Sequence, residues 1–200
     1  MQETHVTLIE RLAHGRDNES WRTFVESYWP LLVRYARRRG ARQQEAEDVA
    51  QDVLRVVADR IASFEHAGRM GSFRAWLHRI TTRKVAQLLL DKEKEPDAVG
   101  GTVGLRMIAA VSAHDEESDE IWEDTWRKRA LEVAMERARA EVQPATWRAF
   151  QLCALEGVTP AEAAAELRMP VGKVYVYKSR VAHRIRRIAE RMDEEIESHG

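Results

Sequence analysis

Apolar side chains recur at three- and four-residue steps along most of this chain, which is the spacing of amphipathic helices. The pattern predicts helices over about residues 7–15, 18–39, 44–63, 72–93, 122–141 and 145–156. Pro30 is expected to bend or break the second of these helices. No run of alternating β-branched residues is long enough to predict a strand. We therefore expect an all-α fold.

Turn-forming and acidic residues divide the chain into two parts. Pro96 is followed by Gly100, Gly101 and Gly104, and an acidic stretch then extends to about Asp124. Such a composition is typical of a flexible linker. We expect a small helical domain over residues 1–95, an acidic flexible linker over residues 96–121, and a second helical domain over residues 122–200.

The second domain is predicted to end in a helix-turn-helix. Thr159 and Glu162 have the spacing of a capping box, and Pro160 falls at the first helical position. Pro170 and Gly172 allow a tight connection to a longer helix. The second helix of such a pair fits the major groove of DNA. Its predicted exposed face supplies our candidates for upstream DNA contact: Lys173, Tyr175, Val176, Lys178, Ser179, Arg180 and Arg184.

These candidates divide by chemistry. Arg180 can pair bidentately with guanine, Ser179 can form a hydrogen bond to a base, and Val176 can touch a thymine methyl group. Lysine and the later arginines suit phosphates, which position the helix without specifying sequence. Tyr175 has two interpretations, a base contact or packing against the preceding helix.

Charge and cysteine content limit the other function classes. The net charge is −1, but Arg168 to Arg191 carries eight basic residues against one acid. One cysteine, Cys153, excludes an internal disulfide and a cysteine-based zinc site. The seven histidines form no paired ligand motif, and we expect no metal and no cofactor. The start of the chain has no secretory leader, and no stretch has the length of a membrane span, so we expect a cytoplasmic protein without membrane contact.

Three segments in order give the chain a family resemblance. They are Glu45 to Val53, Gly71 to Ile80, and Val171 to Arg180. In this order and at these separations, the segments resemble the small sigma factors of bacterial RNA polymerase, the extracytoplasmic-function (ECF) type of the sigma-70 superfamily. The resemblance implies two DNA-binding halves: the first opens and recognises the minus-ten element of a promoter, and the second recognises the minus-thirty-five element.

The resemblance also implies that core RNA polymerase is a partner. Docking is expected on the clamp helices of the largest polymerase subunit and on the flap, and promoter DNA is the second partner. The predicted polymerase contacts lie on the exposed face of the helix over 44–63; they are Asp48, Gln51, Asp52 and Arg55. Charged groups on such a face orient a complex more than they strengthen it. The simpler alternative is a solvated helix face. The sequence leaves open whether the chain also binds an anti-sigma factor.

Single-stranded DNA at the minus-ten element is expected to meet the loop over 65–71 and the following helix. Basic side chains suit its phosphates, and aromatic side chains can stack on its bases. The candidates are Arg69, Arg74, Trp76, Arg79, Arg83 and Lys84. Trp76, like Phe73, is more easily explained as a core residue. Many relatives carry Asn and Asp where this chain has Arg83 and Gln87. The minus-ten sequence preference of those relatives is therefore not assigned to this chain.

Two rival classes remain. A stand-alone helix-turn-helix regulator would bind duplex operator DNA by itself. Such a regulator would have a ligand-binding or receiver domain in its N-terminal half. The absence of βα alternation there disfavours this class. An enzyme is disfavoured because the chain has no Gly-rich phosphate loop and no serine elbow. The acidic linker has two interpretations, a mimic of nucleic acid or a plain spacer.

Overall fold

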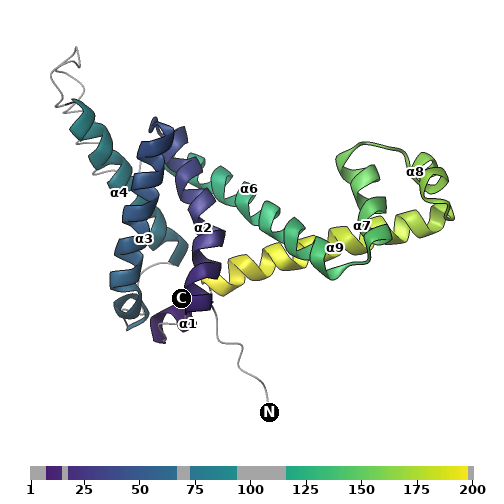
Figure 1. The fold of residues 1–200 in the computed structure, drawn as a ribbon, viewed down its shortest axis with the longest axis horizontal. Helices are drawn as coiled ribbons and strands as arrows, with labels where there is room; N and C mark the ends of the chain where they lie inside the picture. Colours follow the sequence, from purple (N-terminus) through teal and green to yellow (C-terminus); the bar gives the residue numbers. More distant parts are fainter. Residues whose placement is uncertain (1–7, 15–17, 67–72, 94–115, 198–200) are drawn as a thin grey trace. The chain divides into compact units, whose positions relative to one another are not determined.

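A computed structural model describes residues 8–14, 18–66, 73–93 and 116–197 of the chain (Figure 1). Within these ranges every regular element is a helix, which confirms the predicted all-α class. The chain divides into two compact units. The first is Met1–Arg129 together with Glu195–Gly200, and the second is Ala130–Glu194.

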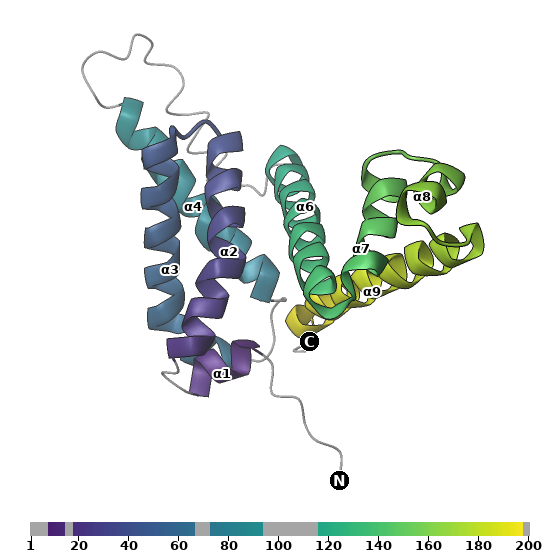
Figure 2. The ribbon, with the colours of Figure 1, turned by 45° about the vertical axis from the view of Figure 1, so that its right-hand side comes forward.

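Among the described residues, the first unit consists mainly of four helices and the first half of a fifth. They are α1 (Leu8–His14), α2 (Asn18–Arg38), α3 (Gln43–His66), α4 (Phe73–Glu93) and the first half of α6 (Glu116–Glu141). Figures 1 and 2 both draw α2, α3 and α4 side by side. The predicted helices lie within a few residues of these bounds, although Glu65 and His66 continue α3 where a loop was expected. The helix α2 continues through Pro30, and a left-handed glycine, Gly40 with φ of 99°, follows it.

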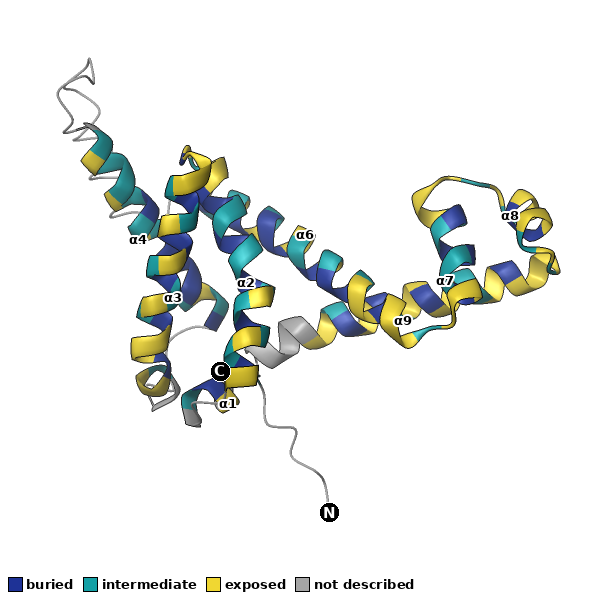
Figure 3. Ribbon diagram, viewed as in Figure 1, coloured by how far each residue is buried: buried dark blue, intermediate teal, exposed yellow. Residues whose placement is uncertain are grey.

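The core of this unit follows the predicted periodicity. Phe24 and Leu32 of α2, Val53 of α3 and Leu77 of α4 are completely buried. Phe73 joins the aromatic part of this core, with its ring centroid 5.8 Å from that of Phe24. The alternation of buried and exposed positions is visible along α3 in Figure 3. Burial of one apolar stripe per helix therefore assembles α2, α3 and α4.

The C-terminal boundary that the sequence predicted for the linker was wrong. Residues 116–121, expected in a flexible linker, form the start of α6, and the two compact units divide at Ala130 instead of residue 122. Three acids, Glu116, Glu117 and Asp119, occupy the first turn of this helix. Acids at a helix N-terminus are favoured by the helix dipole, so an acidic composition did not exclude a helix. Residues 96–115 of the predicted linker lie outside the described residues.

The second unit contains the rest of α6 and the predicted helix-turn-helix. Its other elements are α7 (Pro144–Phe150), the π-helix η1 (Gln151–Leu155), α8 (Pro160–Leu167) and α9 (Val171–Glu197). The helix predicted over 145–156 is thus α-helical only in its first part. Gly157, with φ of 72°, follows it as expected for a glycine that ends a helix. Two apolar clusters hold the unit together, one around Val181 and one around Leu152.

Candidate functional sites

The start of α8 is fixed by a complete capping box. The backbone N–H of Glu162 donates to the Thr159 hydroxyl at 3.3 Å, and the backbone N–H of Thr159 donates to the Glu162 carboxylate at 3.1 Å. Hydrogen bonds from the Thr159 side chain and backbone lower the pKa of Glu162. At the other end of α8, Arg168 adopts a left-handed conformation with φ of 51°. These two ends define the first helix of the pair, as the sequence predicted.

The helix α9 separates an inward apolar stripe from an outward polar face. Val174 and Val181 are completely buried, whereas Tyr175 is 58% exposed and Val176 is 53% exposed. Ser179 and Arg180 are also exposed. The alternating bands on α9 in Figure 3 follow this division. Tyr175 is thus mostly accessible, and the side chains proposed to contact bases share an exposed face.

The proposed phosphate contacts of α9 differ in their surroundings. Lys173 is exposed, with its Nζ 5.4 Å from the centroid of the Tyr177 ring. Lys178 is half-buried. Arg184 forms an ion pair with Glu141 of α6, which lies in the same compact unit. A phosphate contact by Arg184 would therefore compete with this ion pair.

Sequence analysis did not identify an ion-paired cluster that ties α7 to α8. Arg148 donates to Glu156 at 2.7 Å and to Glu166 at 2.9 Å. Hydrogen bonds to Glu166 and then to Glu156 raise the pKa of Arg148. These residues are separated by up to 18 positions in the sequence, so no helical spacing indicates the contact. These ion pairs help to hold α7 and α8 in position relative to each other.

The predicted polymerase-binding face of α3 is accessible, and one of its residues forms an ion pair with α4. Asp48, Gln51 and Arg55 are exposed, and Asp52 is partly so. Asp52 accepts hydrogen bonds from Arg55 at 2.8 Å and from Lys84 at 3.1 Å. Lys84 was predicted to contact DNA, so the structure links one residue from each candidate set. The four predicted residues nevertheless lie along one side of α3.

The predicted minus-ten residues divide between surface and core. Arg79 and Arg83 are exposed on α4, and Arg69 lies outside the described residues. Trp76 stacks on Phe64 with ring centroids 4.8 Å apart and packs against the apolar core. This supports the packing interpretation of Trp76, which the sequence already favoured.

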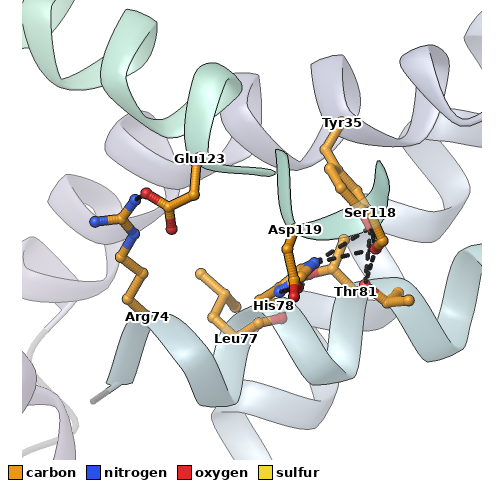
Figure 4. A network of polar contacts seen from close by, with 9 residues as sticks. Tyr35, Arg74, Leu77, His78, Thr81, Ser118, Asp119 and Glu123 are labelled. Carbon is orange, nitrogen blue, oxygen red and sulfur yellow. Dashed lines mark hydrogen bonds and ion pairs between the residues drawn. The ribbon is translucent and has the colours of Figure 1, made fainter. Parts of the chain in front are cut away.

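Arg74 occupies a different place from the one predicted. Its side chain is only 16% exposed and forms an ion pair with Glu123 of α6 (Figure 4). Its guanidinium carbon also lies 4.8 Å from the centroid of the Trp126 ring. The sequence suggested an open phosphate contact, but α6 covers this arginine because Trp122 and Trp126 are buried in the same core.

A polar network under α6 was also missed by sequence analysis. The Tyr35 hydroxyl lies 2.7 Å from the Ser118 hydroxyl and 2.8 Å from the Thr82 hydroxyl. The buried ring of His78 lies beside both Tyr35 and Ser118, and its Nδ1 is 3.5 Å from Asp119 (Figure 4). One local feature of the sequence could have indicated that α6 packs on this surface. Trp122 and Trp126 are four residues apart, which is the spacing of an apolar helix face.

Within the described ranges, no cluster of three or more histidine, cysteine or carboxylate side chains has an arrangement that could hold a metal ion. No helix among these residues combines the length and apolar character that crossing a bilayer requires.

Comparison with known proteins relates the chain to one family profile and, among its relatives, to a bacterial sigma factor. A family profile described as Sigma-70 region 2 matches residues 24–95, which include most of α2 and all of α3 and α4. The chain is also similar to the ECF RNA polymerase sigma factor SigE of Mycolicibacterium smegmatis, at 28% identity over 155 residues. These residues cover 78% of this chain and 56% of the relative, so the chain spans little more than half of the relative's length.

Proposed function

We propose that this chain, which matches the Sigma-70 region 2 profile and is similar to an ECF sigma factor, binds core RNA polymerase and directs the enzyme to specific promoters. In this proposal the second unit recognises the upstream promoter element, and the first unit binds the minus-ten element and helps to melt it. The polymerase carries out the chemistry, and the protein acts in the cytoplasm, where promoters are transcribed.

The recognition helix α9 carries this proposal most directly. Its first turns present Tyr175, Val176, Ser179 and Arg180 on one accessible face, while Val174 and Val181 fix the opposite face in the core. A helix that enters the major groove uses residues near its N-terminus to contact base edges. The exposed side chains have the hydrogen-bonding and apolar groups that such contacts need.

The first unit supports the polymerase-binding and minus-ten parts of the proposal. Asp48 and Gln51 lie on the accessible face of α3, within the region that matches Sigma-70 region 2. Arg79 and Arg83 are exposed on α4 and suit the phosphates of a melted strand. We assign the polymerase contact to α3 and the contact with single-stranded DNA to this exposed side of α4.

Run-off transcription with purified core polymerase tests the proposal. Templates are drawn from upstream regions whose transcript starts appear after overexpression of the protein in its host. We expect transcripts that depend on both the protein and an intact promoter, because neither component alone selects the start site. The absence of any promoter-dependent transcript on all of these templates would contradict the proposal.

A second assay distinguishes the proposed function from the rival function, that of a stand-alone regulator. Such a protein would shift its operator duplex in a gel without polymerase. We expect the chain to produce a promoter-specific shift only together with core polymerase. A specific shift by the chain alone, with no effect of core polymerase, would favour the rival.

A further inference from the structure

The structure places Lys84 on the flank of α4 that faces α3. Ile80 and Leu88, four residues to either side of it, are partly buried hydrophobic residues that pack against the core of the first unit. The Lys84 ammonium lies 3.1 Å from the Asp52 carboxylate of α3, and the lysine side chain is 36% exposed. Lys84 therefore lies at the seam between the two helices, where its charged end is partly accessible.

The exposed arginines of α4 lie on a different side of the helix. Arg79 and Arg83 follow the four-residue step that also exposes Gln87. Successive residues of an α-helix are rotated by about 100°, so Lys84 lies about 100° from Arg83 and about 140° from Arg79 around the helix axis. A DNA strand that lies along the two arginines therefore approaches a side of α4 that does not carry Lys84.

The same lysine is close to the predicted polymerase-binding face of α3. On that helix Asp48, Asp52 and Arg55 lie within an arc of about 60°, and the Arg55 guanidinium donates to Asp52 at 2.8 Å. Asp52 thus binds two cations, one from its own helix and one from α4. Because the Lys84 ammonium contacts this carboxylate directly, a protein surface that reaches Asp52 also reaches Lys84.

Lys84 also changes the charge that this surface presents. The α3 residues Asp48, Asp52 and Arg55 carry a net charge of −1, since two are acids and one is a base. Addition of Lys84 makes the group neutral, with two anions beside two cations. Such a surface fits a partner that presents both signs of charge, and it is unsuited to a phosphate backbone, whose anions would face the two carboxylates.

We infer that Lys84 belongs to the polymerase-docking surface of the first unit, where it binds an acidic side chain of core polymerase. The inference rests on the proposed docking of α3 on the polymerase. It extends the docking surface from α3 onto α4, and it reassigns a residue that the sequence placed among the DNA contacts. Asp52 positions the Lys84 ammonium at the edge of the surface, and the polymerase carboxylate completes the contact.

The test compares neutral variants of two lysines that form the same kind of contact. Lys84→Gln removes the proposed docking charge together with one ion pair between α3 and α4. Lys92→Gln removes the same charge together with the ion pair between Lys92 and Glu45, which also joins the two helices but lies about two turns away along each of them. The affinity of the fluorescently labelled full chain for core polymerase is measured by fluorescence anisotropy without DNA.

Lys84→Gln is expected to raise the dissociation constant for core polymerase about two- to fivefold relative to Lys92→Gln, the range for one largely exposed ion pair. In run-off transcription a saturating concentration of core polymerase should restore the activity of Lys84→Gln, because docking is weakened and DNA contact is not. Thermal unfolding checks that both variants are folded.

A charge exchange separates docking from a purely structural role of the ion pair. Asp52→Lys combined with Lys84→Glu keeps an ion pair between α3 and α4 but inverts both charges toward the polymerase. We expect the double variant to be as stable as the unsubstituted chain and to bind core polymerase more weakly than Lys84→Gln does. Normal core affinity of the double variant would overturn the docking role, because the ion pair alone would then account for the effect of Lys84→Gln.

Two other results would overturn the inference while the unsubstituted chain binds core polymerase normally. One is equal affinity of Lys84→Gln and Lys92→Gln for core polymerase. The other is a transcription defect of Lys84→Gln that persists at saturating core polymerase, which would return Lys84 to the DNA contacts. Failure of the unsubstituted chain to bind core polymerase would contradict the proposed function itself, and this inference with it.

Discussion

The assignment of Arg180 to a base edge depends on its position in α9. It lies on the exposed face within the first turns of the helix, near Val176 and Ser179. Arg186 is also exposed but lies further along the same helix. In a helix-turn-helix the early residues of the recognition helix reach the bases, and later basic residues meet phosphates. Two arginines of one helix therefore have different expected roles.

Substitution of Arg180 tests this difference. Arg180→Ala is expected to reduce discrimination between the upstream element and a single-base variant of it by about 1–3 kcal/mol, because a bidentate base contact is lost. Holoenzyme binding to the two promoter fragments is measured by gel shift. Arg186→Ala, the matched control, should weaken binding to both fragments equally. Equal weakening by Arg180→Ala as well would reassign Arg180 to a phosphate.

At the scale of single elements, the capping box decides where α8 begins. Thr159 and Glu162 satisfy each other's backbone N–H groups, which the rest of the helix leaves without partners. Ala163 of this helix is completely buried against Val174 and its neighbours. The cap therefore sets the register with which α8 supports the recognition helix. The sequence predicted this element because a capping box is a local pattern.

Removal of the cap should destabilise the second unit. Thr159→Ala is expected to lower the free energy of unfolding by about 1 kcal/mol, whereas Thr159→Ser, which keeps the hydroxyl, should change it little. Urea unfolding followed by circular dichroism measures both variants. A Thr159→Ala protein as stable as the unsubstituted chain would show that packing alone holds this end of α8.

The same cap predicts a dependence on pH. The pKa of Glu162 is lower in the folded chain because Thr159 donates hydrogen bonds to its carboxylate. A group with a lowered folded pKa contributes stability above its unfolded pKa and loses that contribution as the pH falls through the folded pKa. Over this acidic window, unfolding measurements should show a smaller loss of stability for Thr159→Ala than for the unsubstituted chain.

At the scale of the whole molecule, the first unit extends beyond the segment expected from the sequence. The predicted domain ends at residue 95, but Trp122 and Trp126 complete its core from α6. Tyr28 packs on Trp126 with ring centroids 5.9 Å apart, and Tyr35 packs on Trp122 at 5.3 Å. Loss of one buried tryptophan costs about 3–5 kcal/mol, which is comparable with the total stability of a small domain.

Fragments of the chain test this extension. A fragment of residues 1–129 is expected to unfold cooperatively, and a fragment of residues 1–95 is expected to be less stable or unfolded because its aromatic core is exposed. Thermal unfolding and binding of a hydrophobic dye compare the two. Trp122→Ala in the longer fragment should move its behaviour toward that of the shorter one. Equal stability of the two fragments would contradict the extension.

Local patterns were sufficient for the helices, for the capped helix-turn-helix and for the accessible face of α9. Helical periodicity decides which side chains share a face, and a face that carries Arg180 opposite Val174 and Val181 must be exposed when those valines are buried. The acidic face of α3 follows from the same argument. These features depend on residues only a few positions apart, so one sequence contains the information.

The tertiary structure alone decided the partners of the charged residues. Arg74 and Glu123 are 49 positions apart, and Arg38 and Asp124 are 86 positions apart. No local spacing relates residues at such separations, and only the burial of Trp122 and Trp126 against the first unit brings them together. Periodicity thus placed Arg74 on α4, but the packing of α6 determined that a carboxylate covers it.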